Sequence, residues 1–246
     1  MSRHFLVIGA QRCGTTWLHD VLAAHPEIAM ARPARPEPKA FLGSGALDLE
    51  AYRSRFFSHA TDEHALGEKS TSYLESPEVP ARLAATLGRP HIVVQLRDPV
   101  QRAVSNWSFS RDHGLESRPL NEAVRADLDQ PRAWNRATSV SPFAYVSRGH
   151  YVQDLVRWTE HFEVYVQFLP EVRRSPDRWG PLYRWLGVDE TFRPNLAGVR
   201  THASTVAAEN LDPELIDTLR DHYFESDTAL AALLGRELPW PVRQTA

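Results

Sequence analysis

A glycine-bracketed turn near the N-terminus carries the residues best suited to bind an anion. It reads Gly9-Ala-Gln-Arg-Cys-Gly14-Thr15-Thr16 and follows the apolar run Phe5–Ile8. The glycine spacing is that of a P-loop, but Thr15 stands where a nucleotide hydrolase has its lysine. Glycines let successive backbone N–H groups point into one concavity, and the N-terminus of the next helix adds positive potential. The turn therefore predicts a phosphate site, at which Arg12 either supplies the cation or points into solvent.

A second candidate anion site follows the apolar run His91–Leu96. The chain continues with Arg97-Asp-Pro99, and Ser105 comes eight residues after Arg97. Proline suits the first turn of a helix, so Arg97 in the loop and Ser105 two turns into the helix can approach one anion. Arg-Asp-Pro alone could equally be a structural ion pair and helix cap. Two anion sites at one sheet edge indicate a ligand that is phosphorylated at two places.

Strand and helix patterns alternate around these turns. Short apolar runs at 5–8, 91–96 and 164–168 are typical of buried strands. Helical spacing relates Trp17, Leu18, Val21 and Leu22; Val79, Leu83 and Leu87; Leu155, Trp158 and Phe162; and, as further helices near the C-terminus, Leu215, Leu219 and Tyr223, then Leu230, Leu233 and Leu234. This order predicts an α/β fold, a P-loop-like three-layer domain with a central parallel sheet flanked by helices, and ligands beyond the carboxyl ends of the strands.

Composition narrows the class of protein. The 246 residues are 42% hydrophobic and 24% charged, which suits one globular domain spanning residues 1–246. A net charge of −3 argues against a nucleic-acid partner. The four-residue apolar run at the start is too short for a membrane span or signal peptide. The single cysteine, Cys13, excludes an intramolecular disulfide, and we expect a reducing, cytoplasmic compartment.

The motifs together resemble the sulfotransferases that use 3′-phosphoadenosine 5′-phosphosulfate (PAPS). The turn Gln-Arg-Cys-Gly-Thr-Thr and Arg-Asp-Pro followed by Arg-Ala-x-Ser carry the resemblance. Further stretches match bacterial members and the branch that sulfates heparan-type glycans: Glu37-Pro-Lys-x-Phe41, Gly67-Glu-Lys-Ser-Thr-Ser-Tyr73, Arg148-Gly-x-Tyr151 with Trp158, and Leu233-Leu-Gly-Arg-Glu-Leu-Pro-Trp240.

The resemblance implies a divided donor site. Gln11, Arg12, Cys13, Gly14, Thr15 and Thr16 would hold the 5′-phosphosulfate end, and Arg97 with Ser105 the 3′-phosphate. A late basic loop of the family corresponds loosely to residues 199–204, where Arg200 would cover the 3′-phosphate. Many members have lysine in place of Arg12, so a cation stands at this position in both cases, but the two cations differ in shape and hydrogen-bonding geometry. The product would be 3′-phosphoadenosine 5′-phosphate (PAP), and with no metal-ligand spacing of Cys or His we expect no metal.

Direct transfer needs a base that takes the acceptor's proton and a cation that stabilises the leaving group. Glu37 falls where the glycan-sulfating relatives have their catalytic glutamate, although a loop glutamate could simply pair with Arg35 or Lys39. Arg12 is the first cation, and Lys69 the second unless it is a surface lysine. A histidine base, with no particular residue assigned, stays an alternative.

The acceptor is expected to be a hydroxyl or amine of a saccharide or another small metabolite. Segments around residues 37–60, 110–148 and 193–208 are expected to be loops that wall it, and the aromatic residues Trp107, Phe109, Trp134, Phe143 and Tyr145 suit either stacking on the acceptor or a core. Two other functions stay open: a P-loop small-molecule kinase, disfavoured because it would need the missing lysine, and a non-catalytic nucleotide-binding protein.

Overall fold

The computed structural model describes residues 3–43, 45, 47–131, 142–195 and 209–243. The chain groups into two compact units, Met1–Leu96 with Arg157–Thr201 and Arg97–Val156 with His202–Ala246. Each unit is described by itself, and a single domain over residues 1–246 stays a prediction.

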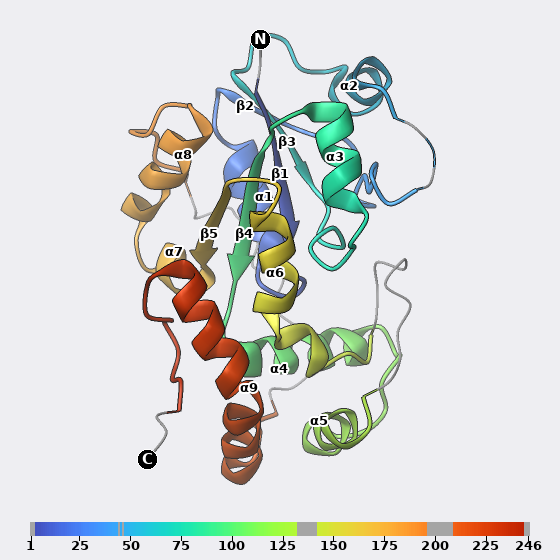
Figure 1. The fold of residues 1–246 in the computed structure, drawn as a ribbon, viewed down its shortest axis with the longest axis vertical. Coiled ribbons are helices and arrows are strands. Elements are labelled where there is room, and N and C mark those ends of the chain that lie inside the picture. The colour runs from blue at the N-terminus through green and yellow to red at the C-terminus, as the bar shows by residue number, and fades with distance from the viewer. Residues whose placement is uncertain (1–2, 44, 46, 132–141, 196–208, 244–246) are drawn as a thin grey trace. The chain divides into compact units, whose positions relative to one another are not determined.

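The first unit holds a five-stranded parallel sheet in the described part of the chain, with strand order β2-β3-β1-β4-β5. The arrows of β1, β4 and β5 point the same way in Figure 1. Its strands are β1 (Arg3–Gly9), β2 (Ile28–Met30), β3 (Ala65–Lys69), β4 (His91–Leu96) and β5 (Val164–Phe168). Its helices are α1 (Thr15–Ala23), α2 (Leu49–Phe57), α3 (Val79–Leu87), α7 (Leu169–Arg174), η2 (Pro176–Trp179) and α8 (Gly180–Leu186).

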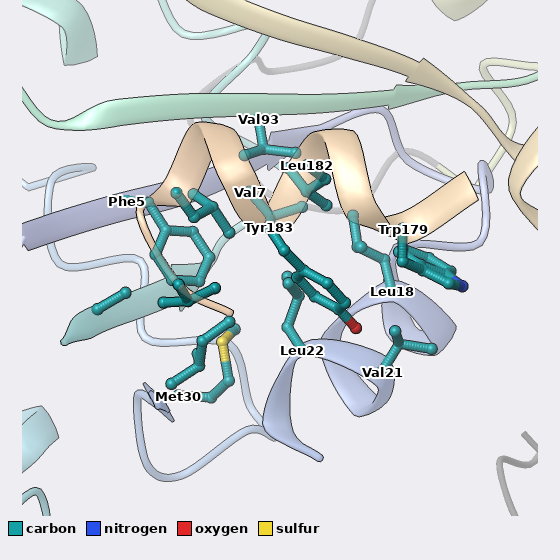
Figure 2. Close-up of a cluster of buried hydrophobic side chains, with 14 of the residues drawn as sticks. Phe5, Val7, Leu18, Val21, Leu22, Met30, Val93, Trp179, Leu182 and Tyr183 are labelled. Atoms are coloured by element: carbon teal, nitrogen blue, oxygen red, sulfur yellow. The ribbon is translucent and has the colours of Figure 1, made fainter. Parts of the chain in front are cut away.

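Helices cover the sheet on both faces, as the alternating pattern predicts. Phe5 and Val7 of β1 and Val93 of β4 pack against α1 and α8, and Figure 2 shows Leu18 and Leu182 in this cluster. Right-handed crossovers place α1, which follows β1 toward β2, and α3, which follows β3 toward β4, on opposite faces. The opposite face of β1 is buried as well, because Leu6 and Ile8 are 0% exposed. The α/β fold with a central parallel sheet and flanking helices is therefore confirmed.

The second unit is helical. It contains α4 (Pro99–Asp112), α5 (Leu120–Asp129), η1 (Ser147–Gly149), most of α6 (Tyr151–Thr159) and α9 (Pro213–Leu234). Trp107, Tyr145 and Tyr223 are among its core side chains. Two of the aromatic candidates for acceptor stacking, Trp107 and Tyr145, are thus core residues, while Trp134 lies outside the described residues.

Several local expectations differ from the structure. The C-terminal pattern forms one continuous helix, α9, rather than several, and Phe162 lies beyond the end of α6. The segments expected as acceptor loops contain α2 and α5. Strand β3 was not expected, because its sequence Ala-Leu-Gly-Glu-Lys carries two charged residues, yet both are buried.

Candidate active site

The turn between β1 and α1 is shaped by two left-handed residues. Arg12 has φ 66° and Gly14 has φ 79°. Such a sequence of backbone conformations turns amide groups toward a common concavity, which suits an anion. Thr15 and Thr16 then begin α1, whose N-terminus no side chain caps, so its first amides remain available to a ligand. The glycine and threonine spacing therefore produces the local structure that a phosphate site requires.

Glutamines from the neighbouring strands hold this turn. Gln95 of β4 donates Nε2–H to the carbonyl oxygen of Cys13 over 2.7 Å and accepts the Ala10 N–H at its own backbone oxygen over 2.9 Å. Gln167 of β5 in turn donates to Gln95 Oε1 over 2.8 Å. Gln95 is 0% exposed and Gln167 4%. The buried amides fix the path of the turn from the sheet, a role that the sequence analysis did not assign to them.

Glu37 and Lys69, which are 32 residues apart in the chain, form an ion pair. Lys69 Nζ donates to Glu37 Oε1 over 2.7 Å, and the two side chains are 6% and 17% exposed. Thr71 donates its backbone N–H to Glu37 Oε2 over 3.0 Å and places its hydroxyl 3.1 and 3.2 Å from the two carboxylate oxygens. Glu37 therefore pairs with Lys69, and Lys69 is not a surface lysine.

Sheet topology brings this pair to the same edge as the turn. Strands β1 and β3 are parallel neighbours, and Lys69 is the register partner of Val7, two residues before Gly9. Beyond β3, Ser70 donates its N–H to Val7 O and Leu74 donates to Ile8 O. The carboxyl ends of the two strands thus present the glycine turn and Lys69 side by side, and the loop after β2 adds Glu37.

A second acidic residue, Glu68, lies on the opposite face of β3. It is 0% exposed, and it accepts hydroxyl hydrogen bonds from Tyr52 at Oε2 (2.7 Å) and from Ser70 (2.6 Å) and Tyr73 (2.5 Å) at Oε1. Burial raises the pKa of Glu68, and these hydroxyl bonds partly offset the shift. Burial, followed by the Glu68 charge, raises the pKa of both tyrosines, which keeps their hydroxyl groups protonated as donors.

His19 of α1 is a histidine whose surroundings include this site. Burial lowers its pKa, the bond to Asp20 opposes the shift, and the charges of Lys69 and Arg35 add to it. His19 Nδ1 lies 3.1 Å from Asp20 Oδ1. His19 is thus the residue on which a histidine alternative to Glu37 would have to be tested.

In the second unit, the backbone around Arg97 is held from two sides. Tyr151 donates its hydroxyl to the Arg97 carbonyl over 2.8 Å. Arg220 of α9 binds both carboxylate oxygens of Asp98 over 2.8 and 2.6 Å, and these side chains are 13% and 17% exposed. Asp98 also accepts the Val100 N–H over 2.9 Å as the cap of α4, with Pro99 at its start. Arg-Asp-Pro is therefore a salt bridge and cap, and this arrangement positions Arg97.

Ser105 lies in the second turn of α4, so Arg97 and Ser105 flank one helix start within one unit. Arg102 between them is structural: it is 0% exposed and donates to the carbonyl oxygens of Ala144 and Tyr145. Arg200, expected over the 3′-phosphate, lies outside the described residues.

The described residues contain neither a cluster of metal-ligating side chains nor a helix suited to cross a membrane. Between residues 3 and 243, leaving out the gaps named above, no group of three His, Cys, Asp or Glu side chains is placed to hold a metal ion. In the same ranges, no helix combines the length and apolar character needed to cross a membrane.

Comparison with known proteins identifies the family. The family model described as "Sulfotransferase domain" matches residues 2–168, which is more than half of the chain. The chain belongs to this sulfotransferase family. The matched range includes the glycine turn, the Glu37–Lys69 pair, Arg97 and Ser105.

Several curated relatives are named as sulfotransferases of heparan sulfate. A bifunctional heparan sulfate N-deacetylase/N-sulfotransferase 1 of Caenorhabditis briggsae is 29% identical over 197 residues, covering 75% of this chain and 22% of that protein. Human heparan sulfate glucosamine 3-O-sulfotransferase 3B1 is 26% identical over 267 residues, covering 96% of this chain and 64% of that protein. The chain therefore spans only part of the length of these relatives.

Solved structures share the fold. A sulfotransferase from Alicyclobacillus acidocaldarius superposes with a TM-score of 0.78 at 23% identity, covering 97% of this chain and 98% of that one. Mouse sulfotransferase SULT7A1 complexed with PAP gives a TM-score of 0.57 at 15% identity, covering 95% and 89%. The P-loop-like sulfotransferase fold agrees with the expectation from the sequence.

Proposed function

We propose that this protein transfers a sulfuryl group from PAPS to a hydroxyl or amine of a saccharide or another small-metabolite acceptor. The observation that carries the proposal is the Glu37–Lys69 ion pair, at 2.7 Å, on the sheet edge that also carries the glycine turn. In the proposed reaction, Glu37 serves as the base and Lys69 as a buried cation, beside a backbone turn that suits an anion. Membership of the sulfotransferase family supports the same reaction class.

The turn Gln11–Thr16 is proposed to bind the 5′-phosphosulfate end of the donor. Its left-handed residues and the uncapped start of α1 offer backbone amides, and Arg12 offers a guanidinium that can bind two oxygens at once. Arg97 and Ser105 are proposed to bind the 3′-phosphate, and Arg200 to cover it. The PAP complex of the mouse structural neighbour supports a PAPS donor.

Glu37 is proposed as the base. The acceptor oxygen or nitrogen forms a bond to sulfur while the bond from sulfur to the bridging phosphate oxygen breaks. Glu37 takes the acceptor's proton, and PAP leaves with the negative charge, which Arg12 and Lys69 stabilise. A sulfuryl group carries less charge than a terminal phosphoryl group, so two fixed cations can serve without a metal.

A saccharide acceptor is proposed because several curated relatives are named for heparan sulfate. One is named as an N-sulfotransferase and the other as a 3-O-sulfotransferase, so the relatives differ in the acceptor atom. Both an amine and a hydroxyl therefore belong in the acceptor screen.

A kinase fits the structure less well. A kinase would use an acidic residue at the end of a strand to hold magnesium, and the candidate for this role is Asp98, two residues after the end of β4. Asp98 instead binds Arg220 through both oxygens and caps α4. The observed geometry thus assigns its carboxylate a structural role.

The test is Glu37→Gln, with the exposed Glu78→Gln as the matched control. With labelled PAPS and a panel of glucosamine-containing saccharides, phenols and amines, E37Q should lower kcat by roughly 10²- to 10⁴-fold, since a positioned base contributes about that much. Its PAP affinity should equal that of the wild type, and E78Q should behave as the wild type. An unchanged kcat in E37Q would remove Glu37 from the mechanism.

A further inference from the structure

Strand β3 presents two acidic or basic side chains to opposite faces of the sheet. Lys69, in register with Val7, lies on the face that packs against α1, and Glu68, in register with Leu6, lies on the other. Lys69 contacts Glu37 directly. Glu68 has no role in the proposed transfer, yet it is completely buried in the same strand.

A buried carboxylate is costly to keep, so its partners indicate what it does. The partners of Glu68 are three hydroxyl groups, from Tyr52, Ser70 and Tyr73, at 2.5 to 2.7 Å. A hydroxyl group has one proton to donate and can still accept. Each of the three hydroxyl groups therefore donates its proton to Glu68, and its oxygen can still accept a hydrogen bond from another donor.

Two of these hydroxyl groups accept backbone amides of the loop that carries Glu37. Lys39 donates its N–H to Ser70 Oγ over 2.9 Å, and Phe41 donates its N–H to the Tyr73 hydroxyl over 3.0 Å. Two relays thus run from Glu68 through a hydroxyl to the backbone two and four residues after Glu37. Tyr52 binds the same carboxylate from α2, and its hydroxyl is not part of either relay.

We propose that Glu68 is a positioning residue for the base: through Ser70 and Tyr73 it orders the loop at Lys39 and Phe41 and so aims the Glu37 carboxylate at the acceptor. The proposal rests on the proposed function, in which Glu37 is the base. Strand β3 then holds Glu37 twice, directly through Lys69 on one face and through the Glu68 relays on the other.

The chemistry explains why a glutamate stands at this position. A carboxylate only accepts, so it orients all three hydroxyl protons toward itself. In Glu68→Gln, the amide N–H group would face a hydroxyl whose proton then has no acceptor at that place; both relays would persist only with the amide turned toward Tyr52. A neutral side chain of equal volume therefore cannot accept all three hydroxyl protons, whereas the carboxylate does.

The test compares Tyr73→Phe and Ser70→Ala, which each remove one relay, with Tyr52→Phe, which removes a hydroxyl from the same carboxylate and leaves both relays. At saturating PAPS, Y73F should lower kcat by about 10- to 10²-fold, because a misplacement of ~1 Å can cost that much. S70A should lower it in the same direction, and Y52F by less than about threefold. PAP affinity and the thermal midpoint, measured alongside, separate misplacement of the base from loss of the donor site or of the fold.

The second readout is the same set of substitutions in the E37Q background. There the Y73F substitution should cost no further kcat, because the group that it misplaces is already gone. Equal losses in Y73F and Y52F, or an undiminished Y73F effect in E37Q, would overturn the positioning role. A fully active E37Q single variant would instead overturn the proposed function, so the two failures are distinguishable. Should E37Q have no measurable rate, the comparison of Y73F with Y52F decides.

Discussion

Two of the junctions that lead from a strand into a helix, β1–α1 and β4–α4, are built by different means. We call the β1–α1 turn backbone-defined because Arg12 and Gly14 adopt left-handed conformations and the N-cap residue Gly14 has no side chain, while Gln95 and Gln167 support the turn from the sheet. The β4–α4 junction is defined by side chains: Asp98 caps α4 and binds Arg220, and Tyr151 binds the Arg97 carbonyl.

This difference matches what each junction is proposed to bind. A left-handed turn at a helix start offers several backbone dipoles to a group whose charge shifts during transfer, whereas a side-chain junction fixes one guanidinium for a phosphate that does not react. PAP binding at the β1–α1 turn should therefore be sensitive to an added side chain, and PAP binding at the β4–α4 junction to the loss of one charge.

The largest effect is expected for Gly14→Ala. Gly14 has φ 79°, and an added Cβ would lie 2.8 Å from Leu169 Cδ1. Left-handed strain alone costs about 1–3 kcal/mol, and the turn would also have to shift. We expect a lower thermal midpoint and a loss of PAP affinity of tenfold or more, about 1.4 kcal/mol or more.

Gly235→Ala is the matched control, because Gly235 is left-handed like Gly14, with φ 61°, but has open space around its Cβ position. It should lose stability from the backbone strain alone and keep its PAP affinity. Similar PAP affinities for the two variants would contradict a backbone-defined turn.

The next effect is expected for Arg220→Met, which leaves Asp98 without its partner in a region where both side chains are largely buried. Urea unfolding should show a loss of about 1–3 kcal/mol, and titration should show weaker PAP binding through the displaced Arg97. Arg243→Met breaks the exposed pair with Asp221, at 48% and 59% exposure, and should leave the urea midpoint close to that of the wild type, because solvent screens an exposed ion pair. Equal losses in the two variants would show that the Asp98 pair is dispensable.

Gln95→Leu tests how the sheet supports the backbone-defined turn. It removes the donor to the Cys13 carbonyl, whereas Gln167→Leu removes a partner one step farther away. Both should cost about 1–2 kcal/mol of stability, since each leaves a buried amide or carbonyl unsatisfied. PAP affinity, followed by calorimetry, should fall several-fold in Q95L and less in Q167L; the reverse order would be incompatible with the assigned roles.

The last prediction concerns the pH dependence of stability through Asp227, a buried residue of α9. Burial raises the pKa of Asp227 to about 6, while its bond from Trp240 Nε1 at 2.9 Å opposes the shift. Because this pKa is higher in the folded than in the unfolded chain, Asp227 destabilises the fold increasingly as the pH rises from about 4 through 6. Asp227→Asn should equal the wild type near pH 4 and exceed it at pH 7 by on the order of 1 kcal/mol. Identical pH profiles of the two proteins in thermal unfolding would contradict a buried Asp227 carboxyl with a raised pKa.

The sequence predicted the parts of the fold in which apolar runs have no competing signal. Strands β1, β4 and β5 and the glycine turn follow from such runs, and Pro99 starts α4 as expected. Strand β3 was missed because Glu68 and Lys69 read as surface residues, and only their distant partners make them suitable for burial.

The candidate site shows the same division. Residue type singled out Arg12, and the family resemblance singled out Glu37 and Lys69. The pairing of Glu37 with Lys69 depends on sheet order, which spacing does not reveal. The sequence gives no sign that Thr71, Gln95 and Arg220 support the site. Their role depends on the residues that they contact, which are Glu37, Cys13 and Asp98.

The central claim is that the protein binds a doubly phosphorylated adenosine nucleotide for sulfuryl transfer. Calorimetric titration with PAP in the absence of magnesium tests it most directly, with ATP plus magnesium titrated in parallel. The account predicts saturable PAP binding that Arg97→Ala weakens and Glu37→Gln leaves unchanged. Saturable binding of ATP with magnesium, without any binding of PAP, would contradict it.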